Sequence, residues 1–246
     1  QAVLISLGMQ GAAARMQTKH GRLVFNGNPV RMSFLEERKR DACCAIVGLR
    51  SDLKTVLITG GSQGAKALND AVAGCLSRLL DVEPHLQIVH QCGDKNLNEL
   101  KEQLPPGLWE SPRYHLRAYF DDLSMAYAIC DLAVTRAGAM TVAELAVTGT
   151  PAIFVPYPYA AQDHQTHNAR FMEAQKAAVV LPQGSLSAEA LYEQIVSLLA
   201  DDGRLLEMRK HMKEQAKPDA ALSLARQLKE ISLSYMGATL SAAATR

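Results

Sequence analysis

The sequence predicts an α/β fold of the Rossmann-like, doubly wound type, in which helices cover both faces of a parallel sheet. From residue 55 onward, short apolar stretches rich in β-branched residues alternate with longer stretches whose apolar residues recur at helical spacing. Turns rich in glycine and small polar residues separate the two kinds of stretch. Strands that alternate with helices form parallel sheets, because each helix carries the chain back to the start of the next strand.

The expected strands share a run of Val, Ile, Leu or Thr bounded by turn residues. They are residues 55–59, 86–91, 114–117, 132–135, 152–155 and 178–181. The expected helices between them have apolar residues three or four positions apart, and are residues 65–80, 96–103, 123–128, 141–147 and 166–175. Three further helices follow the last strand, at residues 187–200, 203–216 and 220–235.

The first 50 residues do not continue this alternation. Two strands at 3–7 and 22–25, with a helix at 34–48, are too few elements for an independent core. We interpret residues 1–50 as the remnant of another domain together with a linker. Residues 51–236 are interpreted as a complete domain, and residues 237–246, rich in Ala, Ser and Thr, as a flexible tail.

The composition excludes several classes of function. The 246 residues include 26 basic and 25 acidic side chains, a net charge of +1 that does not indicate a nucleic-acid partner. The five cysteines are odd in number and form no C-x-x-C pair, which favours reduced thiols over disulfides or a zinc site. No apolar run approaches the ~20 residues that span a bilayer, and the N-terminus lacks the features of a signal peptide.

The glycine-rich segment GGSQGAKALND, residues 60–70, follows one expected strand and begins an expected helix. Glycine lets the main chain approach a ligand, and a helix N-terminus offers unpaired N–H groups with about half a positive charge. Ser62 can add a hydroxyl donor, so the segment predicts a phosphate site. A turn that needs glycine only for packing is the alternative. The spacing is neither G-x-G-x-x-G nor a P-loop, for which Lys66 stands too late.

A second glycine-containing turn follows the expected strand at 132–135. Gly138 permits close approach of the main chain, and Glu144 in the next helix can accept the two hydroxyls of a ribose. Thr141 and Glu144 also have the spacing of a capping box, so a purely structural role is an equal alternative.

The segment PYP at 156–158 fixes an extended chain, and DHQTHN follows at 163–168. Amide and imidazole groups ahead of a helix suit the recognition of sugar hydroxyls; the alternative is an N-cap at Asp163 with solvated neighbours. His164 and His167 have no evident third ligand, so no metal site is expected. Because ligands bind beyond the carboxyl ends of parallel strands, we expect the loops at 60–64, 118–122, 136–141 and 156–165 to converge.

Four strings carry a resemblance to one family. They are GNPVR at 27–31, GGSQGAKALND at 60–70, AYFDDLSMAYAICDLAVTRAGAMTVAE at 118–144, and PYPYAAQDHQTHNA at 156–169. In this order they resemble the MurG family of bacterial peptidoglycan N-acetylglucosaminyltransferases. The resemblance implies a GT-B-type enzyme that transfers N-acetylglucosamine from UDP-N-acetylglucosamine to lipid I, undecaprenyl-diphosphate-muramoyl-pentapeptide, with inversion, giving lipid II. It also implies no metal or other cofactor, and a cytoplasmic, peripheral location on the inner face of the cell membrane.

The resemblance further implies which residues bind the donor. Glu144 would hold the ribose hydroxyls, and Ser62 would bind the diphosphate. The main chain at Phe120 would contact uracil, although Phe120 could also be a core aromatic. Gln165 and His164 would contact the sugar, and Arg31, otherwise an ordinary surface charge, would approach the nucleotide. The other implied contacts are Gly61, Gln63, Arg136, Gly138, Ala139, Met140, Thr141, Val142 and Ala143.

The family also opens with a G-G-T-G-G-H segment whose histidine is the favoured candidate for the catalytic base, and no such segment occurs here. The catalytic residues are therefore unknown, and we expect this chain to bind UDP-N-acetylglucosamine but to transfer poorly alone. Two alternatives remain. The chain could be a related GT-B galactosyltransferase, or a non-catalytic UDP-sugar-binding subunit whose acceptor domain is a separate chain.

Overall fold

The computed structural model describes residues 2–11 and 21–244, and the chain divides into two compact units. The larger unit is residues 31–216, and the smaller combines residues 1–30 with residues 217–246. Residues 31–50, which the sequence assigned to a domain remnant and linker, thus group with the larger unit.

The larger unit is built on one parallel sheet whose strands have the order β5-β4-β3-β6-β7-β8. The strands are β3 (Lys54–Thr59), β4 (Leu86–Gln91), β5 (Tyr114–Arg117), β6 (Leu132–Thr135), β7 (Ala152–Phe154) and β8 (Ala178–Val180). All six were predicted to within one residue at each end. Their interiors are almost completely buried, because helices cover both faces of the sheet.

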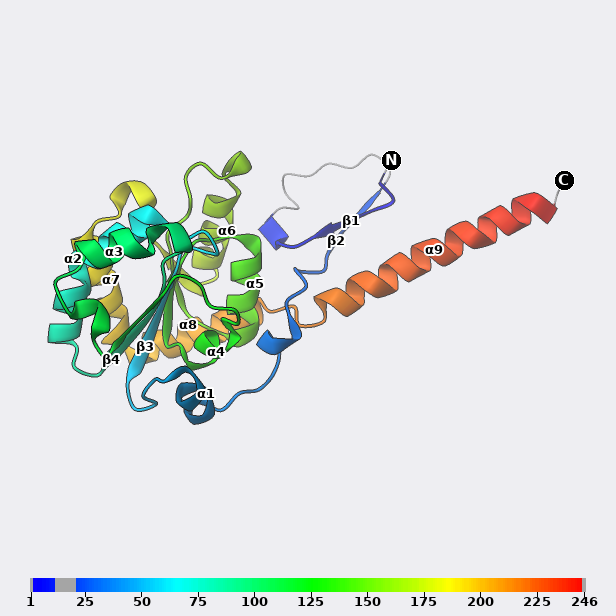
Figure 1. Cartoon of the computed structure of the whole chain (residues 1–246). Helices are drawn as coiled ribbons and strands as arrows, with labels where there is room; N and C mark the ends of the chain where they lie inside the picture. The colour runs from blue at the N-terminus through cyan, green and yellow to red at the C-terminus, as the bar shows by residue number, and fades with distance from the viewer. Residues whose placement is uncertain (1, 12–20, 245–246) are drawn as a thin grey trace. The chain divides into compact units, whose positions relative to one another are not determined.

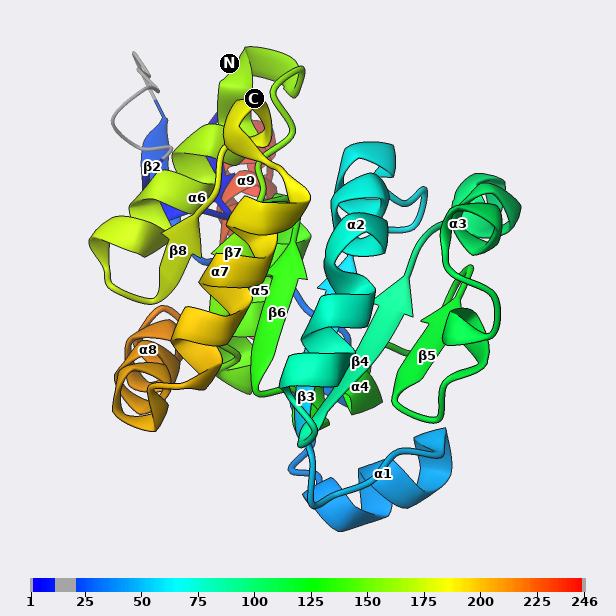
Figure 2. The same ribbon diagram turned by 90° about the vertical axis from the view of Figure 1, so that its left-hand side faces the viewer.

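The helices form two layers (Figures 1 and 2). One face of the sheet is covered by α2 (Lys66–Val82) and α7 (Ala188–Leu199), and the other by α4 (Ser124–Ile129) and α5 (Ala139–Thr148). The remaining helices of this unit are α3 (Leu97–Gln103), α6 (His164–Ala174) and α8 (Asp202–Glu214). Val56 and Ile58 of β3 belong to the core cluster with Leu68 and Leu76 of α2. Because successive strand residues point to opposite faces, Leu57 points to the other layer.

The order of the strands reverses between β3 and β6. From β3 the chain continues to β4 and β5 on one side, then returns to add β6, β7 and β8 on the other. The loops that follow β3 and β6 therefore leave the sheet beside each other, at the switch point where open α/β sheets bind ligands.

The helix expected at residues 34–48 is shorter than predicted. A 3-10 turn, η2 (Met32–Phe34), comes first, and α1 (Arg40–Val47) begins only after extended chain at Lys39. Phe34 is buried against Tyr127, with ring centroids 5.4 Å apart. The Arg40 guanidinium donates to the main-chain oxygens of Ile129 and Leu53, both at 2.5 Å. These two anchors stop the intervening residues from joining the helix.

The smaller unit contains a parallel pair, β1 (Leu4–Leu7) with β2 (Arg22–Phe25), and the helix α9 (Ala220–Ala244). Asn26 joins them, because its Nδ2 donates to Ser6 Oγ and to Gln227 Oε1, both at 2.9 Å. The helix α9 continues through residues 237–244, which belong to the alanine-rich segment expected to be a flexible tail. Residues 245 and 246 lie outside the described residues. Across the described chain, no helix is both long and apolar enough to cross a membrane.

Candidate functional site

The glycine loop after β3 uses its glycines in two ways. Gly64 has a φ of +71° and lies against β4's exit, so that a Cβ there would stand 1.8 Å from the Cys92 carbonyl oxygen. Gly61 has a φ of +88°, but a Cβ there would meet no atom within 4 Å. The packing alternative therefore applies to Gly64, whereas Gly61 is needed for its left-handed conformation beside open space.

The N-terminus of α2 carries positive potential without a side-chain partner. Ala65 is its N-cap, the first turn has no acidic residue, and among the described residues no side chain caps it. The first intrahelical bond is from the Asn69 N–H to the Ala65 oxygen, which leaves the three N–H groups at 66–68 outside the helical ladder. By contrast, Ser187 and Asp201 cap α7 and α8. Ser62 and Gln63 are exposed beside the uncapped end.

The second glycine turn leads directly into α5, which begins at Ala139 with Gly138 as its N-cap. The capping box between Thr141 and Glu144 is therefore absent, because Thr141 already lies within the first turn. Glu144 is partly buried, and no hydrogen bond to its carboxylate occurs in the described structure. Burial raises the pKa of Glu144 to about 6, although the charge of Arg31 acts in the opposite direction.

Two residues of this predicted set point inward. The Arg136 guanidinium, 9% exposed, donates to the main-chain oxygens of Val155 and Pro156 and to Gln183 Oε1. It holds the chain after β7, and it lies 5.4 Å from the centre of the Tyr157 ring. The Val142 side chain is buried and its N–H donates to the Gly138 oxygen. Met140, in contrast, is exposed.

The loop before α6 presents one acceptor and one amide. His164 Nδ1 lies 2.8 Å from the Ala161 oxygen, so this nitrogen carries the proton and Nε2 of a neutral ring is an acceptor. Gln165 Oε1 accepts from the Tyr157 N–H, which directs its amide NH₂ elsewhere. Asp163 occupies the N-cap position with a φ of +53°, and its side chain makes no capping bond within the described chain.

Phe120 follows the end of β5, and Arg31 is the first residue of the larger unit. The Phe120 N–H donates to Gln91 Oε1 at 2.9 Å, and the Phe120 side chain is partly exposed. Arg31 is exposed, with its Nη1 3.4 Å from the Asp121 main-chain oxygen and its guanidinium 5.4 Å from the centre of the Phe34 ring. The loops after β3 and β5 are both tied to Gln91, a residue that the sequence reading missed. The available signal was a polar residue at the end of an otherwise apolar, buried strand.

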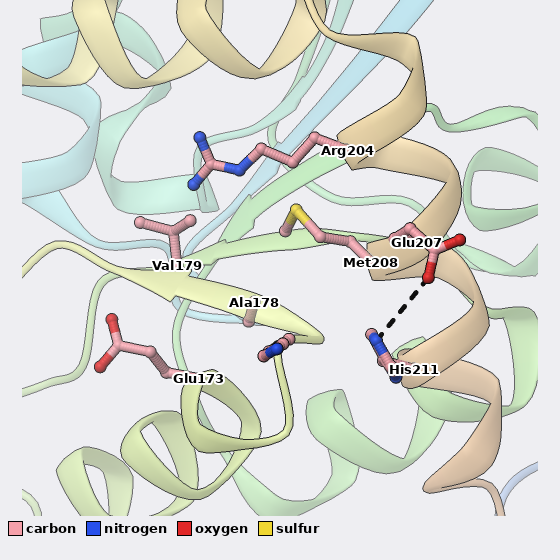
Figure 3. Close-up of a pocket in the computed structure, with 8 residues that line it drawn as sticks. Glu173, Ala178, Val179, Arg204, Glu207, Met208 and His211 are labelled. Carbon is pink, nitrogen blue, oxygen red and sulfur yellow. Dashed lines mark ion pairs between the residues drawn. The ribbon is translucent and has the colours of Figure 1, made fainter.

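A separate cavity of about 510 Å³ lies around β8 and contains none of the predicted site residues. Figure 3 shows Glu173 of α6 on one side, and Arg204, Met208 and His211 of α8 on the other. Ala178, the first residue of β8, lines this cavity. The cavity therefore lies toward the amino ends of the strands, whereas the glycine loops follow their carboxyl ends. Its charges are of both signs. Across the described residues, no group of three or more His, Cys, Asp or Glu side chains is arranged to hold a metal ion.

The fold and the glycine loops define the class of protein. The family model of the glycosyltransferase family 28 C-terminal domain matches residues 55–224, the part of the chain that forms the parallel sheet and its helices. The chain therefore contains a family 28 glycosyltransferase domain, with the fold of one of the two domains of a GT-B enzyme.

Individual relatives identify the family within this class. Two curated transferases named UDP-N-acetylglucosamine--N-acetylmuramyl-(pentapeptide) pyrophosphoryl-undecaprenol N-acetylglucosamine transferase are similar to this chain. The one from Azoarcus sp. is 42% identical over 206 residues, and the one from Halothermothrix orenii is 38% identical over 208 residues. The matches cover 83% and 82% of this chain, and 55% of each relative.

Among solved structures, Acinetobacter baumannii MurG matches with a TM-score of 0.68 and 29% identity, over 92% of this chain and 66% of that one. The chain belongs to the MurG family. It spans about half the length of the curated relatives that it matches.

Proposed function

We propose that this chain binds UDP-N-acetylglucosamine and supplies the donor side of the transfer of N-acetylglucosamine to lipid I, which gives lipid II. Membership of the MurG family supports this reaction, and the site supports the donor. The observation that carries the proposal is Glu144, a partly buried carboxylate with no hydrogen bond from the described residues, on the helix that leaves the switch point. Partial burial disfavours the charged form of this carboxylate, and hydrogen bonds from a ligand would offset that cost.

In this proposal the glycine loop and the N-terminus of α2 bind the diphosphate. The N–H groups at 66–68 and the Ser62 hydroxyl would donate to phosphate oxygens, and the helix dipole would stabilise the negative charge of UDP as it leaves. Stabilisation of the leaving group by preorganised donors lowers the barrier of an inverting displacement. No group of the described site is assigned as the base that takes the proton of the acceptor hydroxyl.

Four of the other predicted residues would select the nucleoside and the sugar. Glu144 would accept hydrogen bonds from both ribose hydroxyls, and Phe120 would border the uracil. The free NH₂ of Gln165 and Nε2 of His164 offer one donor and one acceptor to sugar hydroxyls. We further propose that the protein works at the inner face of the cell membrane, where its lipid-linked acceptor is embedded.

The decisive experiment is calorimetric titration of the purified chain with UDP-N-acetylglucosamine. Glu144→Ala should weaken binding by about 1–3 kcal/mol, the value of hydrogen bonds to a charged, partly buried partner. Glu207→Ala on α8 is the matched control and should bind normally; the Glu207 carboxylate lies 3.9 Å from His211, its one ion-pair partner among the described residues. A wild-type chain that binds no donor would contradict the proposal, and preference for UDP-galactose would favour the galactosyltransferase alternative.

Catalysis needs its own test. Transfer to a lipid I analogue should be slow with this chain alone. It should increase when an N-terminal acceptor domain of a MurG relative is added. Full activity without that addition would show that the chain contributes its own base, and would contradict a donor-only role.

A further inference from the structure

Gln91 connects two loops of the proposed donor site. It is the last residue of β4 and is 1% exposed. Its Nε2 donates to Thr59 Oγ1 at 3.3 Å and to the Gly61 oxygen at 3.1 Å. Its Oε1 accepts from the Phe120 N–H at 2.9 Å. One buried amide therefore bonds both the loop after β3 and the loop after β5.

Both loops need such an attachment. The Gly61 oxygen also accepts from the Gly64 N–H at 3.0 Å, which closes the turn that contains Ser62. Gln91 therefore bonds to the residue at which this turn begins. Two glycines with positive φ make that turn intrinsically flexible in the unfolded chain, and fixing it costs conformational entropy. Phe120 lies beyond the end of β5, where the strand ladder no longer constrains it.

We infer that Gln91 is a positioning residue, which sets the diphosphate loop and the nucleoside border at Phe120 relative to each other without itself touching the donor. Its burial behind both loops excludes direct contact with a ligand in this conformation. The inference rests on the proposed function, since it assumes that these two loops bind the diphosphate and the uracil of the same UDP-sugar.

The same strand contains an internal control. Gln87 is also 1% exposed, and its Nε2 donates to Thr55 Oγ1 at 2.9 Å and to the Arg50 oxygen at 2.6 Å. Its Oε1 accepts from the Arg50 N–H at 3.1 Å. Thr55 pairs with Gln87, and Thr59 with Gln91, in the register of β3 and β4. The two amides thus make equivalent bonds at opposite ends of β4, and only Gln91 lies at the site.

The test compares Gln91→Met with Gln87→Met in the full chain. Methionine is of similar size and cannot replace the amide bonds, so both variants should lose thermal stability. Gln91→Met should also bind UDP-N-acetylglucosamine roughly five- to tenfold more weakly, which corresponds to about 1–1.4 kcal/mol of lost loop ordering. Gln87→Met should bind within about twofold of the wild type. Equal affinities, or equal losses in both variants, would overturn the inference.

A second measurement does not depend on the ligand. In the ligand-free chain, hydrogen exchange at the Phe120 and Gly64 amides should accelerate in Gln91→Met, and exchange at Arg50 should accelerate in Gln87→Met. Unchanged exchange at Phe120 would overturn the positioning role, whether or not the wild type binds the donor. A wild type that fails to bind would contradict the proposed function alone.

If Gln91→Met does not fold, Gln91→Glu replaces it, with Gln87→Glu as its control. A glutamate at 91 keeps the acceptor for the Phe120 N–H and removes the donor to Gly61. It should therefore accelerate exchange at Gly64 more than at Phe120, and the reverse order would overturn the assignment of the two bonds.

Discussion

Thr59 and Thr135 are register partners on β3 and β6, and each is the last residue of its strand before a glycine loop of the proposed site. Both side chains are almost completely buried. Thr59 Oγ1 accepts from the Gly61 N–H at 3.2 Å, whereas Thr135 Oγ1 has no hydrogen-bond partner within the described residues. Because the two strands flank the point where strand order reverses, the pair brings the two loops to the same place.

Donor affinity should depend on pH through Glu144. Burial raises the pKa of this carboxyl to about 6. In the proposed site the ionised form would accept hydrogen bonds from both ribose hydroxyls with two oxygens, whereas protonation turns one of these oxygens into a donor. The affinity of UDP-N-acetylglucosamine should therefore fall as the pH drops below that value, by up to about tenfold per pH unit. The diphosphate of this ligand is esterified at both ends, so its own charge stays constant.

Calorimetry from pH 8 to pH 5 checks this prediction, with Glu144→Gln as the control. The amide should bind more weakly than the wild type at pH 8 and show little dependence on pH. An equally steep pH profile in wild type and Glu144→Gln would assign the titration to another group.

The glycines of the first loop should differ in their tolerance of alanine. Gly64→Ala adds a Cβ 1.8 Å from the Cys92 oxygen at a positive φ, and should cost about 2–4 kcal/mol of unfolding free energy. Gly61→Ala has strain but no clash, and should cost about 1–2 kcal/mol. Gly184→Ala, where a Cβ meets nothing within 4 Å, is the control. Urea unfolding measures all three, and equal losses at 61 and 64 would contradict the packing role of Gly64.

His90 should make the protein less stable in mild acid. It is fully buried between Tyr114 OH, 2.7 Å from Nδ1, and Asn69 Oδ1, 3.1 Å from Nε2. Burial lowers its pKa to about 3, while in the unfolded chain the imidazole takes up a proton near its ordinary value of 6.5. As the pH falls, protonation therefore stabilises only the unfolded state, by about 2 kcal/mol between pH 7 and pH 5.

The measurement is the slope of unfolding free energy against pH for wild type and His90→Gln. Glutamine can hydrogen-bond in the cavity but does not titrate, so the variant should lose less stability over this interval even if it is less stable at pH 7. Parallel slopes would show that His90 does not supply the acid sensitivity.

Arg40 should be important for stability although it lies far from the glycine loops. Its guanidinium donates to the oxygens of Ile129 and Leu53 and pairs with Asp131 at 3.1 Å. Arg40→Met should reduce the unfolding free energy by about 1–3 kcal/mol, because two main-chain acceptors lose their partner. Arg50→Met, which breaks only the exposed pair with Asp52, should give no measurable change in thermal melting. A similar loss in both variants would contradict the anchoring role.

Much of the fold follows from local patterns. The six strands of the large sheet were predicted to within a residue, because strands covered on both faces are continuous apolar runs bounded by turn residues. The glycine-rich turn before α2 was predicted because glycine is the residue that most readily adopts the positive φ angles found at Gly61 and Gly64. The prediction was weaker at residues 34–48, because the start of α1 depends on contacts of Phe34 and Arg40 with residues near 127–131.

By itself, the sequence determined the parallel α/β architecture, the two glycine loops and the family, since these depend on residue type and spacing along the chain. Only the tertiary structure decided that Arg136 and Val142 point inward, that Thr141 does not cap α5, and that Gln91 holds Phe120. The physical reason is distance along the chain. Gln91 and Phe120 are 29 residues apart, and their hydrogen bond exists only once β4 and β5 pair in register.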